Sequence, residues 1–218
     1  MTAARQDSAR KRQLLDAAYD YVIEHGLTEL SLRPLAEAIG SSPRVLLFLF
    51  GSKDGLVLAL LARARADELA MLADVETGGG LAEVGQQVWR WLAHPDRRRL
   101  LTLWAEGYAR SLVNPAGPWA DFAQRTVHDG LDILAAAQPT RLRRTARGAA
   151  ERTLLLAVLR GALLDLLATG EMARTTAAVT AHLSDLAAAT SAQSNSDTTI
   201  AARAARRQAN GSHRGGRR

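Results

Sequence analysis

Two short apolar segments separated by a Gly-Ser-Ser-Pro turn constrain the fold of this chain more than any other feature. The first has leucine, alanine and isoleucine three and four residues apart and ends at Gly40. The second begins at Pro43, directly after Ser42, and ends at Gly51. Serine before a helix, proline at its first position and glycine after its last are preferred boundary residues. The spacing predicts two helices joined by about four residues, which is the helix-turn-helix arrangement.

Further helices are predicted on both sides of this pair. A preceding helix spans residues 8–25, where apolar residues recur on one face and Gly26 follows. Ser31 is expected to cap the first helix of the pair. Ser52 is expected to cap a long helix that runs from there to about Glu76 and leads into the rest of the chain.

This stretch resembles the DNA-binding signature of TetR/AcrR-type one-component transcriptional regulators. The resemblance covers about a fifth of the chain and is carried by Leu32 to Ala38, Gly40, Ser42-Pro43, Phe50, Ser52-Lys53 and Leu56. It implies that residues 43–49 form the recognition helix, with its N-terminal residues facing the major groove. One departure is the run from Arg44 to Leu49, RVLLFL, which lacks the threonine and tyrosine hydroxyls that often hold phosphate in the family.

The predicted DNA contacts divide into base and backbone contacts. Arg44 is expected to read a guanine, because its fork matches O6 and N7, with contact to phosphate alone as the alternative. Lys53 is expected to meet a phosphate at the start of its helix. Leu47 and Phe48 either touch a thymine methyl or pack inward, and the spacing leaves both open. The predicted DNA-binding residues are Arg33, Ser42, Pro43, Arg44, Val45, Leu47, Phe48 and Lys53.

The net charge of +6 is concentrated at the C-terminal end of the chain. Residues 191–218 contain six Arg and one Asp, which leaves 22 basic and 21 acidic residues for positions 1–190. The body is therefore nearly neutral, and the overall basicity does not by itself indicate a nucleic-acid binder. Local cations do: Arg10-Lys11-Arg12, Arg33, Arg44 and Lys53 surround the helix-turn-helix, as expected for contacts with phosphates.

Composition and patterning predict an all-α protein of three parts. Residues 1–51 are expected to form the helix-turn-helix domain, residues 52–190 a helical ligand-binding and dimerisation domain, and residues 191–218 a disordered basic tail with at most a short helix at 199–209. The tail either attracts nucleic acid non-specifically or has no role. The absence of cysteine excludes disulfides and thiolate metal sites. Since no apolar run approaches the ~20 residues of a membrane span, a cytoplasmic protein without membrane contact is expected.

Aromatic residues gather between residues 80 and 139, which hold all four tryptophans. In the resembled family, helices of this region surround a small-molecule cavity, and aromatic walls suit an apolar or aromatic ligand. A plain aromatic core is the alternative. The predicted ligand-binding residues are Trp104, Tyr108, Trp119, Phe122 and His128.

The segment Leu154 to Leu167 is apolar on nearly every side apart from Arg160 and Asp165, which implies a partner helix. In the resembled family the last two helices pair across a two-fold axis, while burial in a larger core of the same chain is the alternative. The predicted dimerisation residues are Leu156, Ala157, Leu159, Gly161, Leu163, Leu183 and Leu186.

These features together predict a ligand-responsive transcriptional regulator, a repressor that binds a palindromic operator as a homodimer. No cofactor, metal or catalytic residue is expected, because the five His are isolated and no nucleophile motif occurs. Two alternatives stay open. One is a helical small-molecule-binding protein or enzyme that has lost DNA binding, and the other is a constitutive architectural DNA binder.

Overall fold

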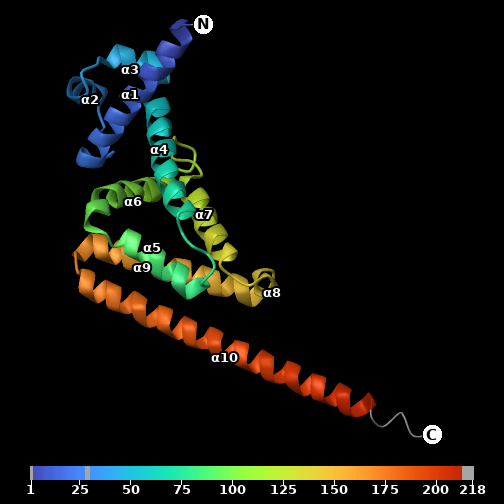
Figure 1. The fold of residues 1–218 in the computed structure, drawn as a ribbon. Helices are drawn as coiled ribbons and strands as arrows, with labels where there is room; N and C mark the ends of the chain where they lie inside the picture. Colours follow the sequence, from blue (N-terminus) through green and yellow to red (C-terminus); the bar gives the residue numbers. More distant parts are fainter. Residues whose placement is uncertain (1, 28–29, 213–218) are drawn as a thin grey trace.

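The computed structural model of the chain describes residues 2–27 and 30–212, and over these ranges it is helical without strands (Figure 1). The all-α class predicted from the sequence is therefore confirmed. The helices are α1 (Thr2–His25), α2 (Leu32–Ala38), α3 (Pro43–Phe50), α4 (Lys53–Ala73), α5 (Leu81–Leu92), the short 3-10 helix η1 (Pro95–Arg97), α6 (Arg98–Val113), α7 (Phe122–Ala136), α8 (Thr140–Arg143), α9 (Ala146–Thr169) and α10 (Met172–Ser212).

Three glycines set the path of the chain through the N-terminal helices. Gly26, Gly40 and Gly51 follow α1, α2 and α3, and all have positive φ, of 81°, 62° and 79°. A side chain with a Cβ pays a steric cost in this conformation, which explains why glycine stands at these turns. The result is the predicted helix-turn-helix, α2 and α3, braced by α1 and the start of α4.

Side-chain caps fix two of the three predicted helix starts. The Ser42 hydroxyl accepts a hydrogen bond from the Val45 N–H at 3.3 Å, and the Ser52 hydroxyl accepts one from the Gly55 N–H at 2.9 Å. The cap expected from Ser31 is wrong: it stands before α2 in extended backbone, but its side chain makes no cap hydrogen bond. Ser31, Arg33 and Pro34 are exposed at this helix start, so water can satisfy its first N–H groups without a side-chain cap.

The first buried core joins the N-terminal helices to parts of the body. It contains Leu14 and Val22 of α1, Leu35 of α2 and Leu46 of α3, together with Leu56 and Leu60 of α4, Leu103 of α6, and Trp119 and Phe122. Packing therefore continues across the predicted boundary between residues 51 and 52, and this division of domains stays a prediction.

Helix α4 connects the helix-turn-helix to the body (Figure 1). Its 21 residues make it about 30 Å long at 1.5 Å per residue. The Tyr19 hydroxyl donates a 2.9 Å hydrogen bond to Asp67, and Arg63 pairs with the same carboxylate, so α1 is held along α4. A second link comes from α6, where the Glu106 carboxylate accepts a 3.0 Å hydrogen bond from the Leu27 N–H just after α1.

A second core lies at the other end of the body, where α5, α9 and α10 run side by side (Figure 1). It is built mainly from leucine and valine and includes one large aromatic residue, Trp89. The indole N–H of Trp89 donates a 3.1 Å hydrogen bond to Thr176 of α10. The buried aliphatic residues of this core include Val84, Leu134, Leu155, Leu159, Val179 and Leu183.

The C-terminal helix departs from the prediction of a disordered tail. Helix α10 continues without a break to Ser212 and projects away from the body (Figure 1). Alanine and arginine are good helix formers, and the segment has no proline and no glycine before Gly211, so nothing local ends the helix earlier. Residues 213–218 of the predicted tail lie outside the described residues.

Candidate functional site

The exposed face of α3 is the first candidate site. Leu46 and Phe50, one turn apart, are buried in the first core and orient the helix. The opposite side presents Arg44, with Leu47 at 41% and Phe48 at 77% exposure. The alternative that Leu47 and Phe48 pack inward is therefore excluded. A phenylalanine this exposed on an eight-residue helix is typical of an interaction surface.

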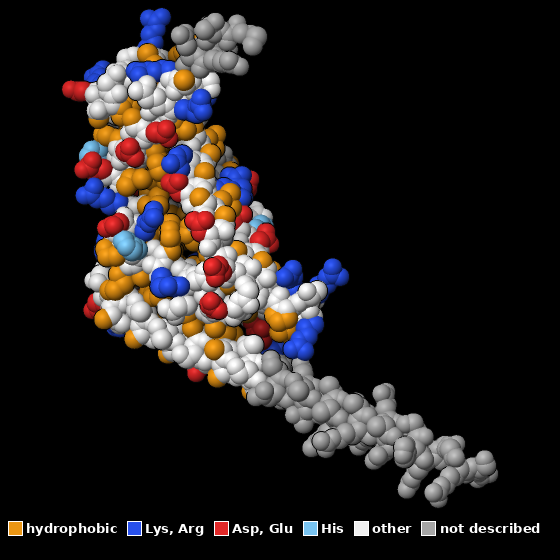
Figure 2. All heavy atoms as spheres, viewed as in Figure 1, with side chains coloured by type: hydrophobic (Ala, Val, Ile, Leu, Met, Phe, Trp, Pro, Cys, Tyr) orange, Lys and Arg blue, Asp and Glu red, His pale blue; other side chains and the backbone are white. Residues whose placement is uncertain are grey.

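Cations stand around this face on neighbouring helices. Arg33 of α2, Arg44 of α3 and Lys53 of α4 are all exposed, and within the described part of the chain none of the three forms an ion pair. Lys11 of α1 lies with its Nζ 5.2 Å from the centre of the Phe50 ring. Figure 2 shows Lys and Arg side chains at the end of the molecule that these helices form.

The remaining predicted DNA-contact residues hold the start of α3. Ser42 and Pro43 are half-buried, and Ser42 forms the cap, while Val45 is 38% exposed beside Arg44. The local sequence thus delivers one long cationic side chain and three apolar ones to a single exposed face. Such a face combines a group able to bond guanine edges with methyl groups able to contact thymine. The DNA contacts of these side chains stay predictions.

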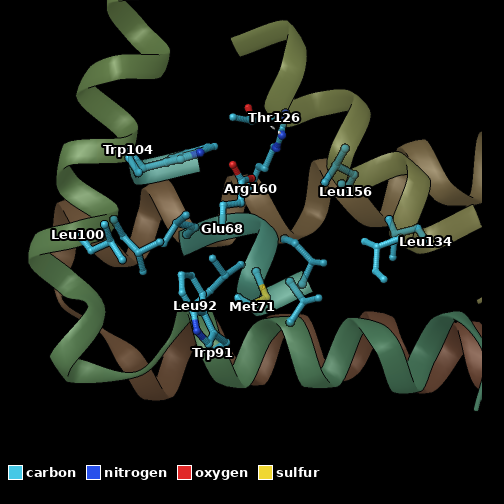
Figure 3. A pocket seen from close by; sticks show the side chains of 17 residues that line it. Glu68, Met71, Trp91, Leu92, Leu100, Trp104, Thr126, Leu134, Leu156 and Arg160 are labelled. Atoms are coloured by element: carbon cyan, nitrogen blue, oxygen red, sulfur yellow. Dashed lines mark hydrogen bonds between the residues drawn. The ribbon is translucent and has the colours of Figure 1, made fainter. Parts of the chain in front are cut away.

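A cavity of about 80 Å³ in the body is the second candidate site (Figure 3). Helices α4, α5, α6, α7 and α9 enclose it, and its wall is largely aliphatic and aromatic. The polar side chains of the wall are Glu68 of α4, Thr126 of α7 and Arg160 of α9. The apolar lining includes Met71, Trp91, Leu92, Leu100, Trp104, Ile133, Leu156 and Leu163.

Arg160 is the cationic group of the cavity. Its guanidinium donates to the Tyr108 hydroxyl and to the Thr126 hydroxyl, both at 3.4 Å. It also lies over the rings of Trp104 and Tyr108, 5.7 Å and 5.3 Å from their centres. Burial lowers the pKa of Arg160, whereas Tyr108 and the carboxylate of Glu68 act in the opposite direction. Aromatic faces and two long hydrogen bonds are modest compensation for a desolvated charge.

Glu68 is the anionic group of the cavity. Burial, aided by the negative charge of Asp129, raises the pKa of Glu68 to about 7, although Arg160 and Arg65 oppose the shift. The Oε2 atom of Glu68 is buried and accepts no hydrogen bond from the described residues. Asp129 itself is engaged by Arg65 through contacts of 2.7 Å and 3.0 Å. Glu68 therefore changes its charge near neutral pH inside an apolar wall.

The predicted ligand-binding residues are divided among three places. Trp104 lines the cavity. The ring centre of Tyr108 lies 5.1 Å from that of Trp104, and the Tyr108 hydroxyl accepts a hydrogen bond from Arg160. Trp119 and Phe122 are buried in the first core and do not line this cavity, so their prediction as cavity wall is corrected. His128 is also corrected, because it is exposed and lines a separate hollow beside Asp132 and Arg152.

Sequence reasoning missed the two charged groups of the cavity. Arg160 carried a signal, since it is an isolated charge in an otherwise apolar run of α9. Glu68 carried none, because it is one of several charged residues along α4, and only the packing of α7 and α9 singles it out.

The predicted dimerisation residues fall on both sides of α9 and α10. Leu159, Leu163 and Leu183 are buried inside the chain, so these three cannot contact a second copy in this conformation and their prediction is corrected. Leu156 is half-buried and lines the cavity. Leu186 is partly buried against the second core. Ala157 and Gly161 are exposed. The missed members of their face are Leu154 and Leu164, at 56% and 53% exposure.

Among the described residues there is no group of three or more His, Cys, Asp or Glu side chains arranged to hold a metal ion. Over the same residues, no single helix has the length and apolar character to cross a membrane. Helix α3 joined to residues 53–71 reaches that length only as a pair bent by 70°.

Comparison with known proteins finds similarity to one family of regulators over part of the chain. Residues 14–60 match the family described as "Bacterial regulatory proteins, tetR family". The chain is 36% identical over 137 residues to the HTH-type transcriptional repressor Rv1474c of Mycobacterium tuberculosis, covering 63% of this chain and 66% of that protein. It is 37% identical over 90 residues to the HTH-type transcriptional repressor AcnR of Corynebacterium diphtheriae, covering 41% of this chain and 44% of that protein.

The chain thus spans less than two thirds of the length of each of these curated relatives. The fold match extends further along the chain. A crystal structure of a transcriptional regulator from Rhodococcus sp. Rha1 superposes with a TM-score of 0.68 at 24% identity, covering 80% of this chain and 94% of that one.

Proposed function

We propose that this chain is a transcriptional repressor of the tetR family that binds a palindromic operator as a homodimer and releases it when a small molecule enters the cavity. The observation that carries this proposal is the exposed face of α3 on a helix-turn-helix fold. The proposed role is regulatory and involves no catalysis.

Recognition of the operator rests on α3 and its neighbours. Arg44, in the first turn of α3, is exposed and forms no ion pair with the described residues, so its fork is available to a guanine edge. Leu47 and Phe48 project from the same helix and offer methyl and ring surface to thymine methyl groups. Arg33 and Lys53 flank them from α2 and α4, where their charges suit phosphates.

Dimerisation is assigned to an exposed stripe on α9. Leu154, Ala157, Gly161 and Leu164 recur at three and four residues along one exposed side of the helix. Two leucines over half exposed, with a small residue and a glycine between them, allow close approach of a second helix. An isologous two-fold contact through this stripe, which we name the α9 stripe, would place two recognition helices on one duplex. Operator palindromy would then mirror the symmetry of the protein.

Ligand control is assigned to α4. Its first half packs in the first core through Leu56 and Leu60, under the helix-turn-helix. Its second half contributes Ala64, Glu68 and Met71 to the cavity. A ligand that binds more tightly to one position of α4 than to another shifts the helix toward that position. Because α4 carries the helix-turn-helix, this shift changes the spacing of the two recognition helices. Coupling of about 1–3 kcal/mol is enough for a regulatory response.

Selection of duplexes from a random pool tests the DNA-binding part of this proposal. Wild-type protein is expected to enrich an inverted repeat, whereas Phe48→Asp, which places a charge on the exposed face of α3, is expected to enrich nothing. Phe48 makes little contact with the core, so the variant is expected to keep the wild-type circular dichroism spectrum. Enrichment of the same repeat by both proteins would contradict the assignment of α3.

A further inference from the structure

The charges around the cavity are unevenly satisfied. Asp129 and Arg65 pair with each other: Arg65 Nη2 donates a hydrogen bond to Asp129 Oδ1 at 3.0 Å, and Arg65 Nη1 lies 2.7 Å from Asp129 Oδ2 as an ion pair without hydrogen-bond geometry. Arg160 has only neutral hydroxyl partners at 3.4 Å, and among the described residues no carboxylate lies within 4 Å of it. Glu68 has a buried oxygen that no described group bonds. In Figure 3, Arg160 and Glu68 lie close together among the lining side chains, with Trp104 on one side.

A cation, a neutral molecule and a carboxylate would interact differently with Arg160 and Glu68. A cation would compensate Glu68 but would add a second positive charge next to Arg160. A neutral ligand would leave the desolvated guanidinium without an anionic partner. A carboxylate compensates Arg160 through the bidentate geometry that guanidinium favours. It also accepts a hydrogen bond from the Glu68 carboxyl group when that group carries a proton, so both unsatisfied groups gain a partner.

We infer that the cavity binds a small molecule with a single carboxylate and an apolar body, with the carboxylate on Arg160 and Glu68 and the apolar body against Met71, Trp91 and Leu100. This inference rests on the proposed function, since it names the ligand class of the same cavity. The rest of the wall is aliphatic and aromatic, which fits a single polar head group. The small volume of the cavity favours a short aliphatic chain or one aromatic ring.

A dependence on pH follows from the same geometry. The groups that act on Glu68 are Arg65 of α4, Asp129 of α7 and Arg160 of α9, while the lining residues of α5 and α6 are uncharged. Because the pKa of Glu68 is raised to about 7, its proton is present below that pH and lost above it. A bound carboxylate stabilises the protonated form further. Affinity is therefore expected to be highest below pH 7 and to fall as the pH rises above it.

Three ligands with one carbon skeleton test the inference: hexanoate, hexanol and hexylammonium. Binding is measured without DNA at pH 6.5, by tryptophan fluorescence, since Trp91 and Trp104 line the cavity, and by the shift in melting temperature. Hexanoate is expected to bind at least about tenfold more tightly than either other compound, because only its carboxylate forms charge-assisted hydrogen bonds with Arg160. Equal or tighter binding of hexylammonium or hexanol, or no binding of hexanoate at millimolar concentration, would overturn the inference.

Variants separate the two polar groups. Arg160→Met is expected to abolish the preference for hexanoate, and Arg160→Lys, which keeps the charge without the fork, to retain part of it. Arg90→Met is the matched control, because Arg90 is exposed on α5 and does not line the cavity. Glu68→Gln keeps a hydrogen-bond donor at every pH, so it is expected to retain the preference and to lose the decline above pH 7. Unchanged preference in Arg160→Met protein with a cooperative melting transition would overturn the inference.

Failure of the inference and failure of the proposed function give different results. If hexanol or hexylammonium binds and releases the selected operator while hexanoate does neither, the ligand class is wrong and the proposed function stands. If hexanoate binds with the expected preference but the protein enriches no duplex, the ligand class stands and the proposed function is wrong.

Discussion

Replacement of Gly161 by leucine isolates the proposed dimer from the fold of the single chain. A Cβ built on Gly161 meets no heavy atom within 4 Å, so the new side chain has open space around it in one chain. Glycine also lowers helix stability by about 0.8–1 kcal/mol relative to alanine, so the isolated protomer is expected to gain slightly in stability. A loss of association in this variant is therefore attributable to the α9 stripe.

The magnitude follows from the symmetry of the proposed contact. A side chain forced into a close helix contact costs about 1–3 kcal/mol, and a two-fold interface contains the substitution twice. The dimer is thus expected to weaken by about 2–6 kcal/mol, which raises its dissociation constant by about 30-fold to about 10⁴-fold.

Gly85→Ala is the matched control for this substitution. A Cβ on Gly85 of α5 would lie 2.6 Å from Leu183 Cδ2 and 3.2 Å from Leu155 Cδ1, inside the second core. This variant is expected to lower the free energy of unfolding of the protomer, whereas Gly161→Leu is expected to leave it unchanged or higher.

Sedimentation equilibrium over a range of protein concentrations measures the association, and chemical denaturation measures the unfolding of the dissociated chain. Wild-type protein that sediments as a monomer at micromolar concentration would refute the reasoning. So would Gly161→Leu protein with the wild-type dissociation constant.

Three further substitutions or deletions test other parts of the account. Arg44→Ala is expected to weaken operator binding by about 1–3 kcal/mol and to relax base preference at one symmetric pair of operator positions. Lys53→Ala is expected to weaken binding to all sequences alike and to reduce the salt slope by about one. If Arg44→Ala weakens binding to every base-substituted operator equally, Arg44 contacts only phosphate. Glu106→Ala removes the hydrogen-bond acceptor of the Leu27 N–H and is expected to lower the free energy of unfolding by about 1.5–3 kcal/mol. An unchanged midpoint in urea unfolding would contradict this prediction. Deletion of residues 191–218 removes six Arg and is expected to leave the dimer and the choice of operator intact. The non-specific affinity for DNA and its salt slope are expected to fall. Loss of the dimer in sedimentation would show that the end of α10 belongs to the interface.

The helix-turn-helix was predictable from the sequence because its signals are local. Gly40, Gly51 and Ser42 act on the backbone within a few residues of themselves, so spacing alone is enough to locate α2 and α3. Ser31 shows the limit of such reasoning: its position predicts a cap, yet its side chain forms no cap hydrogen bond at this exposed helix start. The course of α10 beyond residue 190 was not predicted because the segment has too few apolar residues to form a core, although its alanine and arginine residues favour a helix.

The cavity and the dimer surface were less predictable because they depend on which side of each helix faces the body. Leu159 and Leu164 are both leucines of α9, but Leu159 is buried and Leu164 is over half exposed. Sequence periodicity cannot separate them when apolar residues occur on every side of α9. Trp104 and Trp119 are likewise indistinguishable by type, although only the first lines the cavity. Glu68 and Arg160 reach the wall of one cavity through the packing of α4 on α7 and of α7 on α9.

The central claim is that two copies of the exposed face of α3 read one duplex, and a hydroxyl-radical footprint of the full-length protein on its selected operator tests this most directly. The account predicts two protected patches related by a dyad, with their centres about 34–36 Å apart along the helix axis or a multiple of that distance. A single protected patch, or weak protection spread evenly along the duplex, would contradict it.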